Sequence, residues 1–379
     1  MKHILFVLDY YLPHRWWVEN VFENIISRLL NKGYKITILT SQFDNELKKE
    51  ESSQNLNIYR IGRSRSSFII FSVFQWIKIF RKNKDISIIH TSTYWWAIPA
   101  SILGKLFHKK VILTVHEIFW KMRYRYKWRF IWFIYKLFEN LIFSFPYDVY
   151  HCVSRYTMNS IRICYGIPDK KIKMIYNGID NDFRNPKKVS ESEILKRKKR
   201  EWRINKDVLL YFWHAGISKG IDFLVEAMPD ILKDNPDSVL VYNLINSKRQ
   251  KYIKNQIQSK IQNTEFSDRV VIYDWFEKND LRKLIAVSDV IIAPSLSEWF
   301  GSVHSECSQM WKILLTTNIS SIPEVAFGKV RFVDPSSAQE ICRWVKNVLH
   351  WVYEEIPTRI FSRDDTVEKL EYIYKTSWI

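Results

Sequence analysis

Glycine is unusually scarce in this chain of 379 residues, which holds 9 glycines but 16 tryptophans. An ordinary glycine usage of about 7% would give roughly 27 glycines in a chain of this length. Cysteine is also rare, and the four cysteines show neither metal-ligand spacing nor a disulfide framework: Cys152, Cys164, Cys307 and Cys342. We therefore expect a reducing compartment and no metal site.

Long apolar runs are missing as well. No uncharged apolar stretch reaches the ~18 residues that a membrane span requires. The apolar run at residues 4–8 is short and is followed at once by Asp9, which argues against a secretory signal peptide. The hydrophobic fraction is 47%, and the chain is long enough for two domains with full cores. We expect a cytoplasmic protein that is soluble or peripheral on the inner face of the membrane.

The formal net charge of +18 raises the question of an acidic partner. The basic residues are spread widely and form no nucleic-acid-binding motif, so we expect no nucleic acid. Residues 119–138 interleave basic and aromatic side chains, as does a helix that lies on an anionic membrane surface. The alternative is an ordinary packed helix whose Lys and Arg side chains reach solvent at its edges.

The most informative segment is residues 294–306, which read PSLSEWFGSVHSE. It holds two carboxylates, Glu298 and Glu306, separated by seven residues. It follows the apolar run at residues 289–293, which is too short for a helix and predicts a buried parallel strand. Glu298 is therefore expected on a strand-to-helix loop and Glu306 about two turns into the helix. Ligands bind at the carboxyl ends of strands in such sheets, and a carboxylate there suits paired sugar hydroxyls. The alternative is a solvated loop glutamate and a surface helix glutamate.

Other segments fall in the same pattern. Residues 1–40 predict strand, loop, amphipathic helix, glycine turn and strand. Residues 111–115 predict a buried strand that ends at His116, and residues 209–222 a strand followed by a loop that contains Lys219. Strands and helices alternate throughout, which predicts two doubly wound α/β domains.

In their order these motifs resemble the retaining nucleotide-sugar glycosyltransferases of family 4, over nearly the whole chain. The resemblance implies the GT-B fold, with two Rossmann-like domains facing across a cleft. It implies an acceptor-side domain at residues 1–182, a nucleotide-sugar-binding domain at residues 183–358, and a last helix within 359–379 that returns to the first domain. It also implies transfer of a sugar to a glycan or lipid-linked acceptor, with no cofactor or metal.

The resemblance assigns roles to matching positions. His116 and Glu298 are expected at the reacting centre, and Glu19 beside the acceptor unless it is only a helix-start glutamate. His214 stands where the family has an arginine, and it can take that role only if it is protonated or as a neutral hydrogen-bond donor. The donor-binding residues implied are Trp16, Trp17, His214, Lys219, Glu298, Phe300, Gly301 and Glu306.

The chain departs from the family in one direction, because tryptophan stands at several family glycine positions: Trp16, Trp17, Trp213, Trp299 and Trp311. Glycine serves there because the backbone reaches positive φ or approaches a phosphate closely. We hypothesise that many of these codons are UGA, read as glycine by the source organism and translated as tryptophan in the printed sequence. Alternatively the tryptophans are genuine, the donor site is filled, and the protein is an inactive binding or membrane-associated scaffold.

Overall fold

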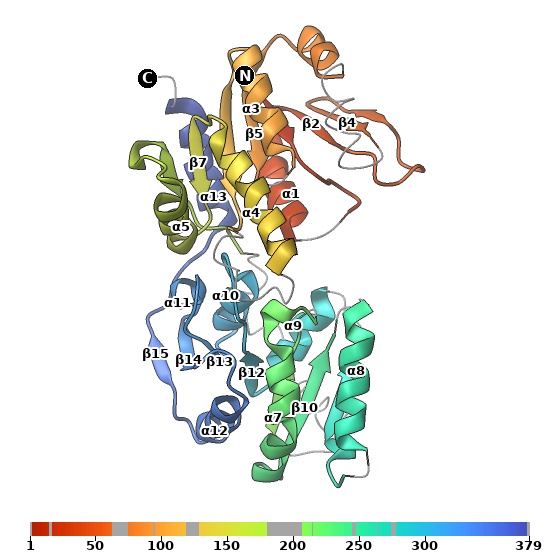
Figure 1. Ribbon diagram of the computed structural model, residues 1–379, viewed down its shortest axis with the longest axis vertical. Coiled ribbons are helices and arrows are strands. Elements are labelled where there is room, and N and C mark those ends of the chain that lie inside the picture. Colours follow the sequence, from red (N-terminus) through yellow and green to blue (C-terminus); the bar gives the residue numbers. More distant parts are fainter. Residues whose placement is uncertain are drawn as a thin grey trace. The chain divides into compact units, whose positions relative to one another are not determined.

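The computed structural model describes residues 2–14, 17–62, 75–93, 95–118, 129–179, 207–213, 215–244, 248–262, 264–273 and 278–376. The chain divides into two compact units (Figure 1). The first unit comprises Met1–Gly178 together with Phe361–Ile379, and the second unit comprises Ile179–Ile360. Each unit is a largely parallel sheet with helices packed on it, so the predicted α/β architecture of two doubly wound domains is confirmed.

The described strands of the first unit form one sheet in the order β3-β4-β2-β1-β5-β6-β7-β8. All neighbours pair in parallel except β3 and β4. The elements are β1 (His3–Val7), α1 (Trp17–Asn31), β2 (Lys35–Ser41), β3 (Glu50–Ser52), β4 (Leu56–Ile61), β5 (Ile86–Ser92), α3 (Ala97–Leu106), β6 (Lys110–Val115), α4 (Arg129–Ser144), β7 (Val149–Cys152), α5 (Arg155–Tyr165), β8 (Ile172–Met174) and α13 (Arg363–Thr376).

The described strands of the second unit form a sheet in the order β11-β10-β9-β12-β13-β14-β15, with only β14 and β15 antiparallel. The elements are β9 (Asp207–Tyr211), α7 (Ile221–Asp234), β10 (Ser238–Asn243), α8 (Lys248–Ile261), β11 (Val270–Tyr273), α9 (Lys278–Val287), β12 (Val290–Ala293), α10 (Ser302–Gln309), β13 (Ile313–Thr317), α11 (Ile322–Val325), β14 (Gly328–Val333), α12 (Ala338–Leu349) and β15 (Glu354–Ile356).

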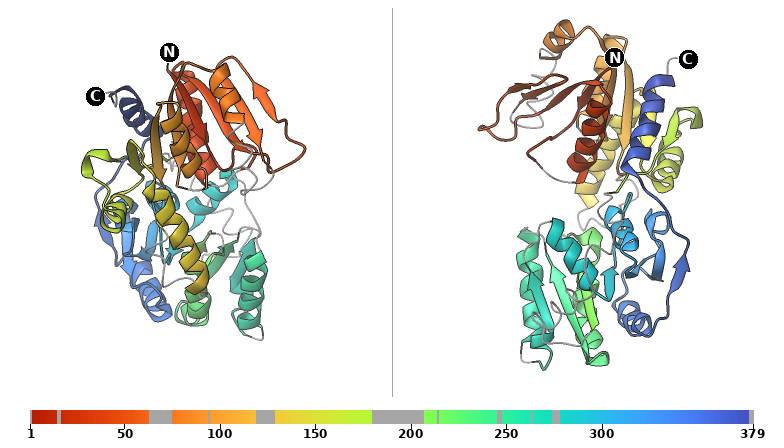
Figure 2. Two further views of the ribbon diagram at one scale, coloured as in Figure 1. Left: turned by 45° about the horizontal axis from the view of Figure 1, so that its top comes forward. Right: turned by 180° about the vertical axis from the view of Figure 1, so that it is seen from behind.

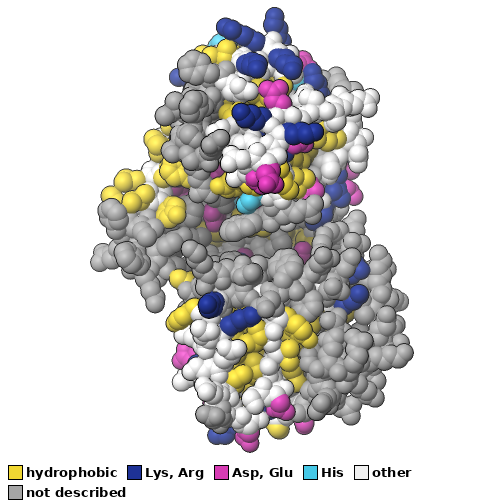
Figure 3. Space-filling model, turned by 90° about the vertical axis from the view of Figure 1, so that its right-hand side faces the viewer, with side chains coloured by type: hydrophobic (Ala, Val, Ile, Leu, Met, Phe, Trp, Pro, Cys, Tyr) yellow, Lys and Arg dark blue, Asp and Glu magenta, His cyan; other side chains and the backbone are white. Residues whose placement is uncertain are grey.

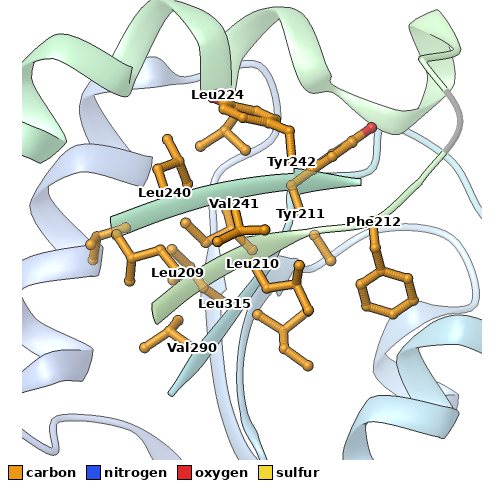
Figure 4. Packing of buried hydrophobic residues seen from close by; sticks show 14 of the residues in the cluster. Leu209, Leu210, Tyr211, Phe212, Leu224, Leu240, Val241, Tyr242, Val290 and Leu315 are labelled. Carbon is orange, nitrogen blue, oxygen red and sulfur yellow. The ribbon is translucent and has the colours of Figure 1, made fainter. Parts of the chain in front are cut away.

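The central strands of the second unit are apolar on both faces. Leu209 and Leu210 are adjacent in β9, so their side chains point to opposite faces, and both are fully buried. Figure 4 shows these leucines among their neighbours from β10 and α7, with Phe212 at the edge of the same buried cluster, beyond the end of the strand. Continuous burial of this kind is typical of a parallel sheet covered on both sides.

The last helix completes the core of the first unit. Side chains of α13, among them Val367 and Leu370, join a buried cluster with Phe22 of α1 and with strand residues such as Ile4 and Ile112. Figure 2 shows α13, drawn in dark blue, beside the elements of the first unit. The helix begins after Ser362, whose hydroxyl accepts a hydrogen bond from the backbone N–H of Asp364 at 3.2 Å.

A buried chain of hydrogen bonds ties α13 to the sheet. Nε2 of His151 lies 3.0 Å from the carbonyl oxygen of Ile175 and must carry the proton, because a carbonyl only accepts. In the neutral ring Nδ1 of His151 then accepts from the Thr114 hydroxyl at 3.0 Å, and that hydroxyl accepts from Nε2 of His90 at 2.7 Å. Nδ1 of His90 is left to accept from the Tyr374 hydroxyl at 2.6 Å. One carbonyl therefore sets the direction of every bond.

Helix α4 leaves an apolar stripe exposed. Phe133, Leu137 and Leu141 are spaced by four residues, share one face, and are each about half exposed, as is Ile134 beside them. We call these four residues the α4 stripe. None of the helices within the described ranges is both long and apolar enough to cross a bilayer. On the face drawn in Figure 3, Lys and Arg side chains gather at the upper end of the first unit.

Candidate functional site

Each sheet has a switch point, where the strand order reverses and the loops at the carboxyl ends of two strands diverge to leave a crevice. In the first unit the switch point lies between β1 and β5, and in the second unit between β9 and β12. Trp17 follows β1, Lys219 follows β9 and Glu298 follows β12. The sequence-predicted residues therefore lie on the loops that bind ligands in sheets of this topology.

In the second unit the structure brings Lys219 and Glu298 together. Nζ of Lys219 donates to Oε1 of Glu298 at 2.6 Å, and the side chains are only 16% and 11% exposed. The hydroxyl of Ser295 donates to the same oxygen at 3.0 Å. The two loops are joined by their backbones, because the N–H of Leu296 donates to the carbonyl of Ser218 at 2.7 Å.

The backbone of both loops is tightly constrained. Gly220 has φ of +66°, and a Cβ at this position would lie 1.9 Å from the carbonyl oxygen of Pro294. Only glycine fits such a contact at such a φ. On the other loop the carbonyl of Glu298 accepts from the hydroxyl of Ser321 at 3.0 Å and from its N–H at 3.3 Å. The carboxylate is therefore held from both its side chain and its backbone.

The electrostatics of this pair follow from its burial. Burial alone raises the pKa of the Glu298 carboxyl, but the Lys219 ammonium, the nearby His304 ring and the hydroxyl of Ser295 outweigh that effect and hold the pKa below its ordinary value. Glu298 is thus ionised at neutral pH. The ionised carboxylate accepts hydrogen bonds and donates none, so it can pair with hydroxyl donors.

The rest of the predicted motif surrounds this pair. Phe300 is buried. Gly301 is the N-cap of α10 and adopts φ of +82°. A Cβ on Gly301 would lie 3.6 Å from the Cβ of Glu298, so the two residues are in contact. Glu306 is half-buried and is the fifth residue of α10, which begins at Ser302. Glu306 therefore lies about one and a half turns into α10, slightly nearer its start than the expected two turns.

His304 is a site residue that the sequence reasoning missed. It lies on the inward face of α10 and is fully buried. Burial lowers the pKa of the ring to about 4, against the opposing influence of the Glu298 carboxylate and of a hydrogen bond to the backbone of Ala293. No sequence signal singled it out, because the inward face of so short a helix is seen only in the structure, where Ser305 and Cys307 are buried beside His304.

In the first unit His116 directly follows β6, as predicted. Its backbone N–H donates to the Thr93 hydroxyl at 3.1 Å, but neither ring nitrogen has a hydrogen-bond partner among the described residues. The ring is fully buried, and burial, assisted by the charge of His151, lowers its pKa to about 3. The indole of Trp17 packs edge to face against it, with ring centroids 4.9 Å apart.

Glu19 belongs to the same unit and is buried in the first turn of α1. Its Oε1 lies 3.3 Å from Nδ1 of His14, so the side chain braces the loop before the helix. Trp16 and His214 lie outside the described residues. In the part of the chain that the structure describes, no three His, Cys, Asp or Glu side chains group as metal ligands do.

The backbone tests the glycine hypothesis at individual tryptophans. Trp311, one of the predicted positions, has φ of +55°, and Trp351, which was not predicted, has φ of +66°. The N–H of Trp351 donates to the carbonyl of Val348 and the next N–H to that of Asn347, which is the Schellman motif that ends helices at glycine. Gly33 has the same two bonds and φ of +82° after α1. Trp213 and Trp299 are buried and do not have positive φ, so the backbone conformation does not require glycine there. At these two positions glycine would instead leave the volume of the indole empty.

We expect Trp351→Gly to be more stable than Trp351→Ala. Both changes remove the indole, which contacts Tyr353 and the Lys329 ammonium, but alanine keeps the Cβ that disfavours the left-handed backbone. The difference should be about 1 kcal/mol in the free energy of unfolding. Urea denaturation of both variants measures it, and an alanine variant as stable as the glycine variant would contradict the assignment of Trp351 to a glycine position.

The comparisons with known proteins agree with this fold and these motifs. Residues 18–183 match the family model "Glycosyltransferase Family 4", and residues 192–351 match "Glycosyl transferases group 1". An uncharacterized 41.2 kDa protein in the cps region of Klebsiella pneumoniae is 26% identical, with 88% of this chain and 90% of that protein aligned. The GPI3 subunit of the Saccharomyces cerevisiae phosphatidylinositol N-acetylglucosaminyltransferase is 20% identical over 85% of this chain and 69% of its own.

Solved structures show the same architecture. A glycosyltransferase from Rickettsia africae superposes with a TM-score of 0.75 at 20% identity, covering 99% of this chain and 98% of its own. The Anabaena protein HepE, solved in complex with UDP and glucose, gives a TM-score of 0.73 at 14% identity, covering 99% and 100%. With the two-domain GT-B architecture, and with family models matched along most of its length, the chain belongs to the family 4 glycosyltransferases.

Proposed function

We propose that the chain transfers a sugar from a nucleoside-diphosphate sugar to a hydroxyl group of a glycan or lipid-linked saccharide, in the synthesis of cell-surface polysaccharide or glycolipid. The observation that carries this proposal is the buried Lys219–Glu298 pair at the switch point of the second unit. The complex of HepE with UDP and glucose supports the donor class, and the cps-region relative supports the polysaccharide role.

The pair offers both functions that a nucleotide sugar needs. The Lys219 ammonium has three N–H groups, of which one donates to Glu298, so it can also donate to a phosphate oxygen. Oε2 of Glu298 can accept from a hydroxyl of the transferred sugar while Oε1 holds Lys219. The backbone at Phe300 and Gly301 supports the same sugar, and Glu306 binds the ribose hydroxyls.

We propose retention of configuration by attack on the same face from which the diphosphate leaves. The acceptor oxygen forms a bond to the anomeric carbon, the bond from that carbon to the phosphate oxygen breaks, and the acceptor proton passes to the departing phosphate. Lys219 and the amino end of α10 stabilise the negative charge that develops on the phosphate, without a metal. His116, neutral at pH 7, hydrogen-bonds the transferred sugar, and Glu19 lines the acceptor side.

Two forms of the chain test this function. One is the chain as printed, and the other carries glycine at positions 16, 17, 213, 299 and 311. Each is incubated with UDP-glucose, UDP-N-acetylglucosamine or GDP-mannose and a lipid-linked saccharide, and products are identified by mass spectrometry, with the anomeric configuration read by proton NMR. We expect transfer by the glycine form. Absence of transfer from both forms, together with UGG codons at these positions, would favour the inactive scaffold.

We further propose that the α4 stripe contacts an anionic membrane on its cytoplasmic face, where a lipid-linked acceptor would lie. Half-exposed Phe133, Ile134, Leu137 and Leu141 form one continuous apolar surface, and the chain is strongly basic. The first part of the basic and aromatic segment, residues 119–128, lies outside the described residues.

Leu137→Glu should weaken binding to vesicles that contain phosphatidylglycerol by about 10-fold or more. The change removes an apolar side chain whose burial in the membrane is worth ~1.5–3 kcal/mol, and it introduces a negative charge that the anionic lipids repel. Ile163→Glu on α5 is the matched control, since Ile163 is an isolated exposed apolar residue. Co-sedimentation with these vesicles and with pure phosphatidylcholine measures the effect. Equal binding of both variants would contradict membrane contact through α4.

A further inference from the structure

Three ring side chains gather at the carboxyl ends of β1 and β2. Tyr10 and His14 follow β1, and Phe43 follows β2. The rings of Tyr10 and His14 lie at 30° to each other with centroids 4.5 Å apart. The ring of Phe43 meets both of them edge to face, with its centroid 5.7 Å from that of Tyr10 and 5.4 Å from that of His14. We call these three residues the loop cluster.

The loop cluster keeps part of its ring surface in solvent. Tyr10 and Phe43 are half-buried, and the side chain of His14 is 28% exposed. Single exposed apolar residues are ordinary on a protein surface, whereas a group of aromatic rings beside a few polar atoms is typical of a binding site. The loop cluster lies at the edge of the sheet where ligands bind in this topology.

The loop that carries Tyr10 and His14 is fixed by the rest of the first unit. The N–H of His14 donates to the carbonyl of Tyr11 at 3.2 Å, and Nη2 of Arg60 donates to the carbonyl of Leu12 at 3.0 Å. Arg60 is itself buried in β4. A site that is held in place before its ligand arrives loses little conformational entropy on binding. The loop cluster is therefore preorganised.

Glu19 determines which nitrogen of the His14 ring carries the proton. Its Oε1 lies 3.3 Å from Nδ1 of His14, and a carboxylate at that distance favours the tautomer with the proton on Nδ1. In the neutral ring Nε2 then bears the lone pair and is a hydrogen-bond acceptor. A sugar hydroxyl can donate to it.

We propose that the loop cluster recognises the sugar ring of the acceptor. The rings of Tyr10 and Phe43 contact the apolar C–H face of that sugar, and Nε2 of His14 accepts a hydrogen bond from one of its hydroxyls. The reacting hydroxyl gives its proton to the departing phosphate in the proposed function, so the hydroxyl that His14 holds is a neighbouring one.

This inference rests on the proposed function and deepens it at the acceptor. The family motifs assign a role to none of the three residues of the loop cluster. Because the contacts go to the sugar ring, and not to a lipid or phosphate linked to it, a free glycoside should bind as well.

Steady-state kinetics test the proposal on the form with glycine at positions 16, 17, 213, 299 and 311, with a lipid-linked saccharide as acceptor. In His14→Asn the side-chain amide can replace Nδ1 beside Glu19 but does not reach the position of Nε2, which the longer amide of His14→Gln does reach. His14→Asn should raise the KM of the acceptor by about 5-fold, as expected for one lost hydrogen bond, and leave the KM of the donor unchanged. His14→Gln should raise the acceptor KM less.

Two further variants complete the comparison. Phe43→Leu keeps an apolar side chain but removes the ring, and should also raise the KM of the acceptor alone. His108→Asn, at an exposed histidine that lies just before β6, is the matched control and should change neither constant. If His14→Gln is more damaging than His14→Asn, the ring acts only on Glu19 and the proposed contact is wrong. If no variant of the loop cluster changes the acceptor KM, the subsite is overturned while the proposed function stands.

A binding measurement needs no transfer activity. In saturation-transfer NMR on the full chain, methyl glycosides of glucose, galactose and N-acetylglucosamine, which carry no lipid, are the probes. We expect at least one of them to bind, with its C–H protons saturated most strongly on one ring face, and we expect Phe43→Leu to weaken this signal. If none binds either the printed chain or the five-glycine form, the loop cluster is not a sugar subsite, whether or not transfer occurs. Glycoside binding without transfer by either form would contradict the proposed function instead.

Discussion

Lys219→Met should lower the rate of sugar transfer by at least 100-fold and also destabilise the second unit. The rate falls because the variant lacks the ammonium that meets the charge developing on the leaving phosphate, and the loss of one such donor typically costs 10²–10³ in rate. Stability falls because the carboxylate of Glu298 stays buried without its counter-charge. Breaking a buried pair costs ~3–5 kcal/mol, and we expect about 2–4 here because both side chains retain slight exposure.

The two effects of Lys219→Met can be separated. In Lys219→Met combined with Glu298→Gln both charges are removed, so stability should return toward that of the parent while transfer remains lost. Lys233→Met, at an exposed lysine of α7, controls for the loss of one positive charge. If the double variant is no more stable than Lys219→Met, the stabilising role of the ion pair is disproved. If Lys219→Met keeps its activity, the phosphate-binding role is disproved.

The loss of stability should depend on pH with a defined sign. The folded-state pKa of Glu298 lies below its ordinary value of 4.5, so its contribution to stability is complete above that value and is lost as the pH falls through the folded pKa. In Lys219→Met burial dominates and the folded pKa rises above 4.5, so protonation favours the folded variant. The difference in unfolding free energy between parent and variant should therefore shrink between pH 7 and pH 4.

Gly220→Ala should have the largest structural effect of any single methyl group in the second unit. The new Cβ would lie 1.9 Å from the Pro294 carbonyl oxygen at a φ of +66°, so the loop must move away from β12. The left-handed φ alone costs ~1–2 kcal/mol, and the displacement adds to it. Because Lys219 is the neighbouring residue, the movement should also separate its ammonium from Glu298 and weaken donor binding by 10-fold or more.

Gly166→Ala is a matched control for this prediction. Gly166 has φ of +60°, but a Cβ there would meet nothing within 4 Å. Its alanine variant therefore reports the backbone cost alone, and urea denaturation of both variants should show a clearly larger loss for Gly220→Ala. Equal losses would mean that the loop yields easily and does not fix the position of Lys219.

The sequence predicted the parts of the site that local patterns determine. The apolar run before Glu298 is β12, and the run before His116 is β6. In both cases the sequence signal and the strand lie within a few residues of each other, as is typical of strands buried on both faces.

What the sequence did not predict depends on packing between distant segments. His304 is buried because α10 turns that face toward β9, and nothing in eight residues of helix specifies this. The left-handed backbone of Trp351 could not be predicted, because the residue that ends α12 cannot be located from the sequence alone. Without that end, the position after the helix that favours glycine cannot be identified.

The hydrogen-bond chain from Ile175 to Tyr374 has a consequence for protein synthesis. Nascent domains usually fold in order from the amino terminus as they leave the ribosome. Here the first unit needs α13 for its core and Tyr374 for the last donor to His90. The second unit, whose strands all precede residue 357, can therefore close before the first unit is complete. The half of the molecule that is translated first is the half that finishes folding last.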